Sequence, residues 1–161
     1  AIPCNTAHAF VASIQEHLKI PIINMLDITA DHIVKIYGKQ TKVGLLATSG
    51  TLQSRVYHDV LTARELTVII PDAEHQHLVM QSIYGDNGVK AGYINGICKE
   101  QILTAAEYVA SNGADVIILG CTELPLLFPL EDEISMNGQN VPLIDPTEVL
   151  AQEIVARAKF S

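Results

Sequence analysis

The sequence has few basic residues and no long hydrophobic run. It contains only 10 Lys and Arg residues against 18 Asp and Glu residues, which gives a formal net charge of -8. The basic residues do not cluster, so we expect no nucleic-acid partner. No apolar run reaches the roughly 18 residues that a transmembrane helix needs, and no signal peptide is recognisable. We therefore expect a cytoplasmic protein without a membrane partner.

Cysteine is also scarce, and its spacing excludes several classes of function. Three cysteines without close pairing favour a reducing compartment over a disulfide framework. The sequence lacks a Cys-x-x-Cys pair, a Gly-x-Ser-x-Gly elbow and a phosphate-binding glycine motif. His75 and His77 are two positions apart in a helical pattern, so their side chains diverge and no metal site is expected there. A redox or metal protein remains an alternative, built on Cys4, Cys98 and Cys121.

Apolar runs and helical periods alternate along the 161 residues, of which 48% are hydrophobic. This alternation predicts an α/β fold with a parallel sheet flanked by helices. We expect helices at about 6–18, 24–38, 51–63, 74–83, 97–111 and 146–159. We expect strands at 21–23, 42–47, 67–70, 116–119 and 141–144, a glycine-rich loop at 84–92 and a polar acidic loop at 131–140.

The most informative stretch places a cysteine at the end of a buried strand. The uninterrupted apolar run 116–119 is typical of a parallel strand covered on both faces. Gly120 permits a tight turn, Thr122 is a helix cap, and Pro125 fits the first turn of the helix that follows. Cys121 is therefore expected over the N–H groups of a helix start, which bind anions and favour a thiolate.

The first residues of the chain repeat this design. Pro3-Cys4-Asn5-Thr6-Ala7-His8 again has an apolar approach, a cysteine and a threonine that opens a helix. Two such corners suggest two thiols that face each other across a cleft. A thiolate on one face of an amino acid can remove the Cα proton while a neutral thiol delivers a proton to the other face. The result is inversion without a cofactor, with backbone and threonine donors holding the developing enediolate.

The two corners resemble those of the cofactor-independent aspartate/glutamate racemase superfamily. The Cys-Asn-Thr motif at 4–6 and the Gly-Cys-Thr-Glu motif at 120–123 carry the resemblance, and similarity extends over 43–48, 83–92 and 142–148. The glutamate branch usually has histidine at the position of Glu123 and usually lacks a histidine at that of His8. Both differences favour the aspartate racemase-like branch.

This resemblance implies a role for each site residue. Cys4 and Cys121 are expected to be the acid/base thiols. Lys90 is expected to meet the side-chain carboxylate of a dicarboxylic substrate. The resemblance implies a wider substrate-binding set of Asn5, Thr6, Thr48, Thr51, Lys90 and Thr122, with Glu123 and His8 in supporting roles.

Several of these residues also have plain structural interpretations. Thr48 and Thr51 are possible helix caps, and capping is compatible with ligand binding. Lys90 also fits a solvated loop. Glu123 either pairs structurally or tunes Cys121, because an acid beside a thiol raises its pKa. His8 either favours the Cys4 thiolate or is an ordinary core or surface histidine, and we expect Cys98 to be structural.

The resemblance implies a racemase that interconverts L- and D-aspartate without pyridoxal phosphate or metal. Family members have two similar α/β lobes and commonly form homodimers. We therefore expect 1–23 to be the remnant of a first lobe, 24–121 a second lobe, and 122–161 a segment that returns to the first lobe. Family members carry a glycine-rich turn and an arginine before the first cysteine. Neither is present here, so we expect that upstream sequence is missing.

Other functions remain open at this point. Relatives with the same cleft include glutamate or broad-specificity racemases, hydantoin racemases, maleate isomerases and arylmalonate decarboxylases. A catalytically silent fragment is the alternative from a different class.

Overall fold

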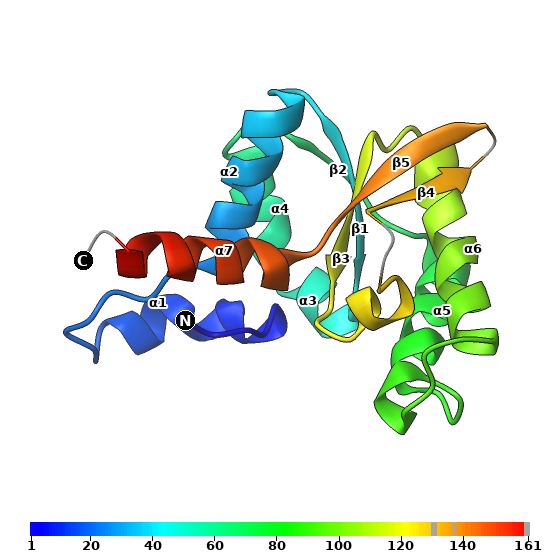
Figure 1. Cartoon of the computed structure of the whole chain (residues 1–161), viewed down its shortest axis with the longest axis horizontal. Helices are drawn as coiled ribbons and strands as arrows, with labels where there is room; N and C mark the ends of the chain where they lie inside the picture. Colours follow the sequence, from blue (N-terminus) through cyan, green and yellow to red (C-terminus); the bar gives the residue numbers. More distant parts are fainter. Residues whose placement is uncertain (130–131, 137, 160–161) are drawn as a thin grey trace.

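The computed structural model describes residues 1–129, 132–136 and 138–159 and contains a twisted five-stranded sheet with helices on both faces (Figure 1). The strand order is β2-β1-β3-β5-β4. Four strands run parallel, and β4 is antiparallel to β5. The strands are β1 (Lys42–Ala47), β2 (Thr67–Ile69), β3 (Val116–Gly120), β4 (Glu133–Met136) and β5 (Gln139–Ile144). The predicted α/β class with a parallel sheet flanked by helices is confirmed, and the antiparallel β4 is an addition that the sequence did not predict.

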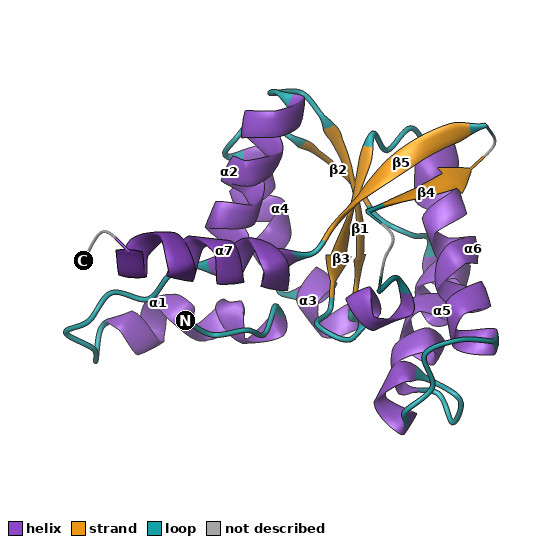
Figure 2. Ribbon diagram, in the orientation of Figure 1, coloured by secondary structure: helices purple, strands orange, loops and turns teal. Residues whose placement is uncertain are grey.

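Helices of the chain cover the two faces of the sheet in separate groups (Figure 2). The longer helices are α2 (Met25–Tyr37), α4 (Val56–Thr62), α5 (Ala73–Tyr84), α6 (Ile97–Ser111) and α7 (Pro146–Lys159). The short ones are η1 (Thr6–Phe10), α1 (Val11–Gln15), α3 (Ser49–Gln53), η2 (Val89–Ala91) and η3 (Leu124–Leu127). No described helix is long and apolar enough to span a bilayer.

The core consists of one apolar layer on each face of the sheet. All five residues of β3 are buried, and its side chains alternate between the layers. Val116 and Ile118 pack in the cluster that contains α2 and α4, whereas Ile117 and Leu119 pack in the cluster that contains α5 and α6. The central strand is thus covered on both sides, as its continuous apolar run predicts.

Local signals explain the boundaries of α2. The Asn24 side chain accepts hydrogen bonds from the backbone N–H groups of Leu26 and Asp27, at 3.0 and 3.2 Å. Gly38 ends the helix with a φ of 89°, a conformation that favours glycine. The helix predicted at 24–38 is confirmed, as are α6 and α7 with their predicted bounds and α5 with a shift of one residue at each end.

Three predicted elements near the amino terminus differ in the structure. The helix predicted at 6–18 is a 3₁₀ turn followed by five α-helical residues. Phe10 on its apolar face is 64% exposed, so tertiary packing does little to extend the helix. The segment 21–23 is not a strand, because none of the described strands pairs with it and the Ile22 N–H donates to Gln15 Oε1 instead (2.7 Å). The helix predicted at 51–63 breaks at Arg55, which adopts a left-handed φ of 57°.

The polar loop predicted at 131–140 is largely a β-hairpin. β4 and β5 pair within it, and residues 131 and 137 lie outside the described part of the chain. Ile134 is buried between the exposed Glu133 and Ser135, which is the alternation of an edge strand with one solvated face. The polar side chains of that face made the segment resemble a loop.

The carboxyl-terminal segment joins the same sheet. β5 pairs with β3, and α7 packs against α2. Figure 1 shows both chain ends on the side of the molecule where α1 and α7 lie. The division of the chain into lobes stays a prediction.

Candidate active site

One small cavity brings together both cysteine corners, which lie at opposite ends of the sequence. Its volume is about 80 Å³. Its walls come from the amino-terminal segment, the end of β1, the end of α5, η2 and the residues that follow β3. The lining residues are Cys4, Asn5, Thr6, Thr48, Tyr84, Lys90, Gly120, Cys121, Thr122 and Glu123.

The register of β1 and β3 positions two walls of this cavity. Ala47 pairs with Gly120, so Thr48 and Cys121 follow neighbouring parallel strands at the same level. A Cβ at Gly120 would lie 2.9 Å from the Ala47 Cβ and 3.0 Å from Leu45 Cδ1. This close approach requires glycine at position 120. The functional groups therefore lie at the carboxyl ends of the strands, where ligand crevices of open α/β sheets lie.

Cys121 belongs to a network of charged and polar side chains. Its thiol donates to Glu123 Oε2 at 2.9 Å, and Thr122 Oγ1 donates to the same oxygen at 3.1 Å. Lys90 Nζ forms an ion pair with Glu123 Oε1 and lies 5.4 Å from the centre of the Tyr84 ring. Both oxygens of the Glu123 carboxylate therefore have partners.

This network determines the protonation of Cys121. Burial, together with the hydrogen bond to Glu123 and its negative charge, raises the pKa of the Cys121 thiol to about 12. Burial acts to raise the pKa of Glu123, but hydrogen bonds from Cys121 and Lys90 outweigh it and lower that pKa to about 2. The hydrogen bond between Lys90 and Glu123 also raises the pKa of Lys90.

The predicted helix cap at Thr122 is wrong. Glu123, not Thr122, occupies the position before η3, and no side chain caps that short helix. Thr122 donates to the Glu123 carboxylate instead. A carboxylate therefore lies beside the sulfur, and its charge opposes a thiolate.

Threonine hydroxyls form a connected cluster on the opposite side. Thr51 Oγ1 lies 2.7 Å from Thr6 Oγ1 and 3.1 Å from Thr48 Oγ1. Thr48 also caps α3 by accepting from the Thr51 N–H at 3.3 Å. Thr6 and Thr48 line the cavity, whereas Thr51 is fully buried behind them. Capping and lining therefore coincide at Thr48, and Thr51 orients the two hydroxyls that face the cavity.

Asn5 supplies a donor without a partner. Its side chain is almost fully buried, and its Oδ1 accepts from the Tyr57 hydroxyl at 2.6 Å. Among the described residues, no hydrogen-bond partner lies near Asn5 Nδ2. Buried amide groups rarely remain unpaired, and Asn5 is one of the residues that line the cavity.

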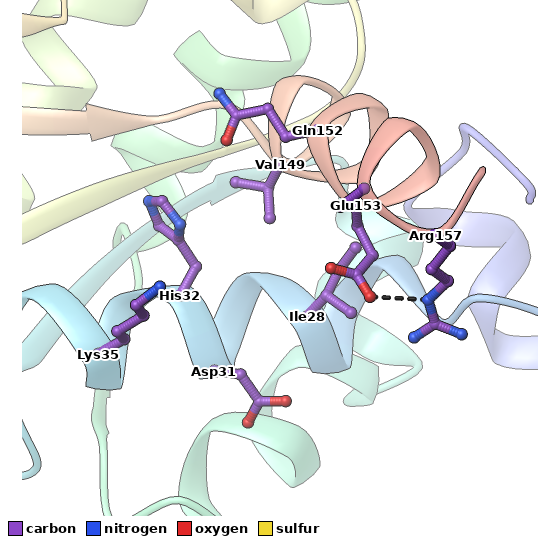
Figure 3. A pocket seen from close by; sticks show the side chains of 9 residues that line it. Ile28, Asp31, His32, Lys35, Val149, Gln152, Glu153 and Arg157 are labelled. Atoms are coloured by element: carbon purple, nitrogen blue, oxygen red, sulfur yellow. Dashed lines mark hydrogen bonds and ion pairs between the residues drawn. The ribbon is translucent and has the colours of Figure 1, made fainter. Parts of the chain in front are cut away.

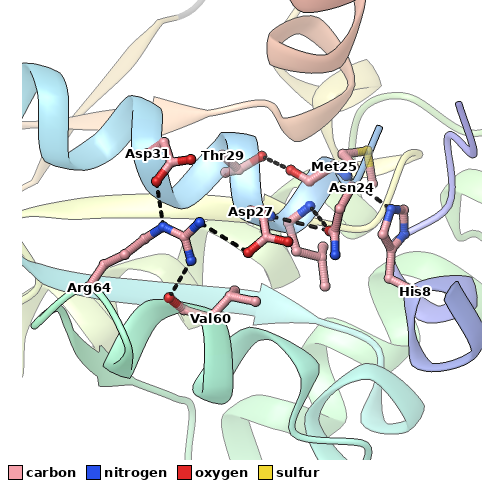
Figure 4. A network of polar contacts seen from close by, with 9 residues as sticks. His8, Asn24, Met25, Asp27, Thr29, Asp31, Val60 and Arg64 are labelled. Atoms are coloured by element: carbon pink, nitrogen blue, oxygen red, sulfur yellow. Dashed lines mark hydrogen bonds and ion pairs between the residues drawn. The ribbon is translucent and has the colours of Figure 1, made fainter. Parts of the chain in front are cut away.

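His8 contacts backbone groups rather than a thiol (Figure 4). Its Nε2 accepts from the Met25 N–H at 3.0 Å, so Nδ1 carries the proton and donates to the Cys4 carbonyl at 2.8 Å. Burial lowers the pKa of His8, which favours this neutral form. His8 is not among the residues that line the cavity, and it joins the Cys4 corner to the start of α2.

The sequence motifs did not indicate that Tyr57 contacts a cavity residue or that Tyr84 lines the cavity. Tyr57 has the helical spacing of a core residue, and its hydroxyl contact with Asn5 spans 52 positions. Tyr84 begins the glycine-rich loop, and no local pattern marks it as a cavity residue. Cys98 lies outside the cavity, where its thiol donates to the Asn95 carbonyl at 3.2 Å.

A larger cavity of about 420 Å³ lies between α2 and α7 (Figure 3). Glu153 and Arg157 pair within it, and Asp31 pairs with Arg64. None of the predicted site residues lines this cavity. Within the described parts of the chain, no group of three His, Cys, Asp or Glu side chains is arranged to hold a metal ion.

Comparison with known proteins identifies the family. Residues 1–154 match the Asp/Glu/Hydantoin racemase family. The chain is 35% identical over 148 residues to an uncharacterised protein of Pectobacterium carotovorum, covering 88% of each chain. It is 34% identical over 157 residues to the broad specificity amino-acid racemase RacX of Bacillus subtilis, covering 97% of this chain and 63% of RacX.

A solved structure supports the same relationship. The aspartate racemase of Picrophilus torridus superposes with a TM-score of 0.75 at 32% identity, over 98% of this chain and 60% of that one. The chain therefore spans less than two thirds of the length of these two racemases. The family match, the fold and the identity to the Pectobacterium protein together show that the chain belongs to the Asp/Glu/hydantoin racemase family.

Proposed function

We propose that the chain is a cofactor-independent amino acid racemase that inverts aspartate with Cys4 and Cys121 as its two acid/base groups. One observation carries this proposal: cysteines from opposite ends of the sequence line the same small cavity. The similarity to RacX and to an aspartate racemase supports racemase chemistry.

The cavity contains the groups that such a reaction needs. One thiolate removes the Cα proton, and the C–H electron pair moves into the substrate carboxylate to form an enediolate. The other thiol then gives its proton to the opposite face of Cα. Asn5 Nδ2 and the hydroxyls of Thr6 and Thr48 are donors for the developing negative charge, which requires donors already in place.

Lys90 is the group that we propose selects a dicarboxylic substrate. Its ammonium lies on the cavity wall and pairs with Glu123 in this structure. A distal carboxylate of the substrate would replace Glu123 as its partner, forming a charge-assisted hydrogen bond. The name of RacX keeps a broad-specificity racemase as the second candidate.

Replacement of Lys90 tests this assignment. We expect Lys90→Met to raise KM for aspartate about 10-fold to 100-fold, because one charge-assisted contact contributes about 1.5–3 kcal/mol. Chiral chromatography of L-aspartate, L-glutamate and L-alanine after incubation measures inversion of each substrate. Lys39→Met is the matched control, because Lys39 also forms an exposed ion pair with a glutamate, Glu65, outside the cavity.

Two results would contradict the proposal. If Lys90→Met inverts aspartate with unchanged KM, Lys90 does not bind the distal carboxylate. If the unaltered protein inverts none of these amino acids, the chain does not act alone on them, and the proposed aspartate racemase activity is contradicted.

By resemblance to its family, we further propose that the protein is a cytoplasmic homodimer. Light scattering coupled to gel filtration measures the mass directly. A mass equal to that of one 17.5 kDa chain would contradict the dimer.

A further inference from the structure

The two thiols of the cavity have different surroundings. Cys121 is buried, and its S–H donates to a carboxylate oxygen 2.9 Å away. Cys4 is exposed, and within the described residues its sulfur has no hydrogen bond to a carboxylate. The geometry therefore distinguishes two residues that the two-thiol chemistry treats as equivalent.

Contacts on both oxygens hold the Glu123 carboxylate in this orientation. Oε2 accepts from Cys121 and Thr122, while Oε1 accepts from Lys90. An ionised carboxylate only accepts hydrogen bonds, so the proton of the contact with Cys121 belongs to the sulfur. A thiolate in this position would place two negative charges in contact.

We propose that Glu123 is a positioning residue that keeps the proton on Cys121 in the resting enzyme, so that Cys121 begins turnover as the acid and Cys4 as the base. This inference rests on the proposed function and deepens it.

Other charged or titratable groups that face Cys121 are consistent with this assignment. Lys90 on η2 favours a thiolate, but its ion pair with Glu123 partly offsets its charge. Tyr84 at the end of α5 and Cys4 in the amino-terminal segment line the same cavity. Burial and Glu123 are the dominant influences, and both raise the pKa of Cys121.

One turnover leaves the two thiols in the opposite protonation states from those in which they began. The Cys4 thiolate takes the Cα proton and becomes a thiol, while the C–H electron pair moves into the carboxylate. Cys121 then gives its proton to Cα, and the S–H electron pair stays on the sulfur as a thiolate beside Glu123. Before the next turnover in the same direction, Cys4 releases its proton to water and Cys121 takes one from water.

The opposite enantiomer requires the reverse protonation of the two thiols, which Glu123 disfavours. Because enantiomers are equally stable, kcat/KM must be equal in the two directions. The asymmetry therefore appears only in the separate values of kcat and KM. Removal of the Glu123 charge changes the ratio of the two kcat values, whereas a merely structural defect lowers both values alike.

The direct test follows thiol ionisation by NMR in the protein labelled with carbon-13 at the cysteine Cβ atoms. The Cβ chemical shift changes when a thiol ionises, and Cys4→Ser and Cys98→Ser variants assign the signals. The titration runs from about pH 6 to about pH 12, so that it covers both the ordinary cysteine pKa of about 8.5 and the raised pKa of Cys121. We expect the Cys121 signal to remain that of a thiol to about pH 10.

Glu123→Gln removes the charge and retains the side-chain size. We expect this variant to lower the Cys121 midpoint by at least about one pH unit, the size of effect that a neighbouring charge has. Glu107→Gln is the control, because Glu107 is exposed on α6 and does not line the cavity. We expect this control to leave the Cys121 titration unchanged.

Two outcomes overturn the inference. The first is that Cys121 of the wild type ionises at about pH 8, close to the ordinary cysteine pKa. The second is that the Cys121 midpoint in Glu123→Gln equals that of the wild type. If Glu123→Gln does not fold, Glu123→Ala takes its place in the same comparison, because burial alone also raises the pKa of Cys121. The titration needs no substrate, so its result is separate from that of the racemase assay. A protein that inverts no amino acid but shows the expected titration loses the proposed function and keeps this role of Glu123.

Discussion

Glu123 contacts three side chains near the cavity, and its charge raises the pKa of two of them, which keeps the thiol neutral and the ammonium charged. It raises the pKa of Cys121, which becomes a poorer thiolate. It also raises the pKa of Lys90, which becomes a more persistent cation. One carboxylate thus favours a protonated sulfur and a charged ammonium on the same wall. This combination suits an acid group next to a carboxylate-binding site.

The lowered pKa of Glu123 makes the stability of the fold depend on pH. Because its pKa falls from 4.5 to about 2 on folding, its contribution is fully present above about pH 4.5 and is lost as pH falls through about 2. At about pH 3 we expect roughly 1–2 kcal/mol of this contribution to be lost, with allowance for partial solvent exposure.

Urea unfolding of the wild type and of Glu123→Gln, followed by circular dichroism, measures this effect. The difference in unfolding free energy between the two proteins should shrink between about pH 6 and about pH 3, because only the wild type carries the titrating group. A difference that stays constant over this range would show that Glu123 has the same pKa in the folded and unfolded chain.

Close pairing of β1 with β3 determines where the segments that line the cavity begin. Thr48 and Cys121 follow directly after paired positions, so any change in the spacing of the strands moves both residues. The Glu123 network then extends from β3 to η2, and the threonine cluster extends from β1 to the amino-terminal segment. The sheet is therefore the common support of a cavity whose walls are loops and short helices.

Gly120→Ala tests this support. The new Cβ would lie 2.9 Å from the Ala47 Cβ, so the strands must shift, and we expect a loss of about 1–3 kcal/mol in unfolding free energy with reduced racemase activity. Urea unfolding measures the stability. Gly50→Ala is the matched control, because its Cβ would make an ordinary contact of 3.7 Å with Thr6 Cγ2. Equal stabilities of the two variants would show that β3 accommodates the methyl group.

Arg64 follows α4 and contacts α2, on the face of the sheet that these two helices cover (Figure 4). Its guanidinium contacts Asp31 at 2.5 Å and Asp27 at 3.0 Å, and it donates to the Val60 carbonyl at 3.1 Å. A lysine ammonium cannot reproduce this forked geometry.

We expect Arg64→Lys to lower the unfolding free energy by about 0.5–1.5 kcal/mol, less at high salt because both carboxylates are partly exposed. Thermal unfolding at low and high salt measures the loss. Arg55→Lys is the control, because Arg55 is exposed. A loss in Arg64→Lys no larger than that in the control would mean that the contacts contribute nothing measurable.

Elements with strong local signals agree best with prediction from the sequence. The helix at 97–111 and the strand at 42–47 match their predicted bounds, because apolar periodicity and flanking glycines define them locally. The segment 21–23 was predicted as a strand from its apolar residues, but none of the described strands pairs with it. The segment 131–140 was predicted as a loop because the solvated face of its edge strand is polar. Motifs predicted the two corners of the site, but they did not predict Tyr84 or the contact of Glu123 with Cys121, which depend on side-chain positions in the folded chain.

At the scale of the whole molecule, folding brings the amino-terminal segment against the carboxyl ends of the central strands. Cys4 comes from that segment and Cys121 follows β3, so the cavity exists only in the folded chain. The exposed apolar side chains Phe10, Ile14, Leu18 and Ile20 lie on the same segment. The position of Cys4 therefore depends on a short stretch that has little packing of its own, anchored through His8 and Thr6.

The most direct test of the central claim is deuterium exchange at Cα of L- and D-aspartate in heavy water, followed by NMR and chiral analysis. It compares the wild type with Cys4→Ser, Cys121→Ser and, as control, Cys98→Ser. We expect the wild type and the control to exchange and invert both enantiomers. Each of the other variants should lose inversion, because one face of Cα then lacks its acid/base group. Inversion that survives in Cys4→Ser or Cys121→Ser, or its absence in the wild type, would contradict the account.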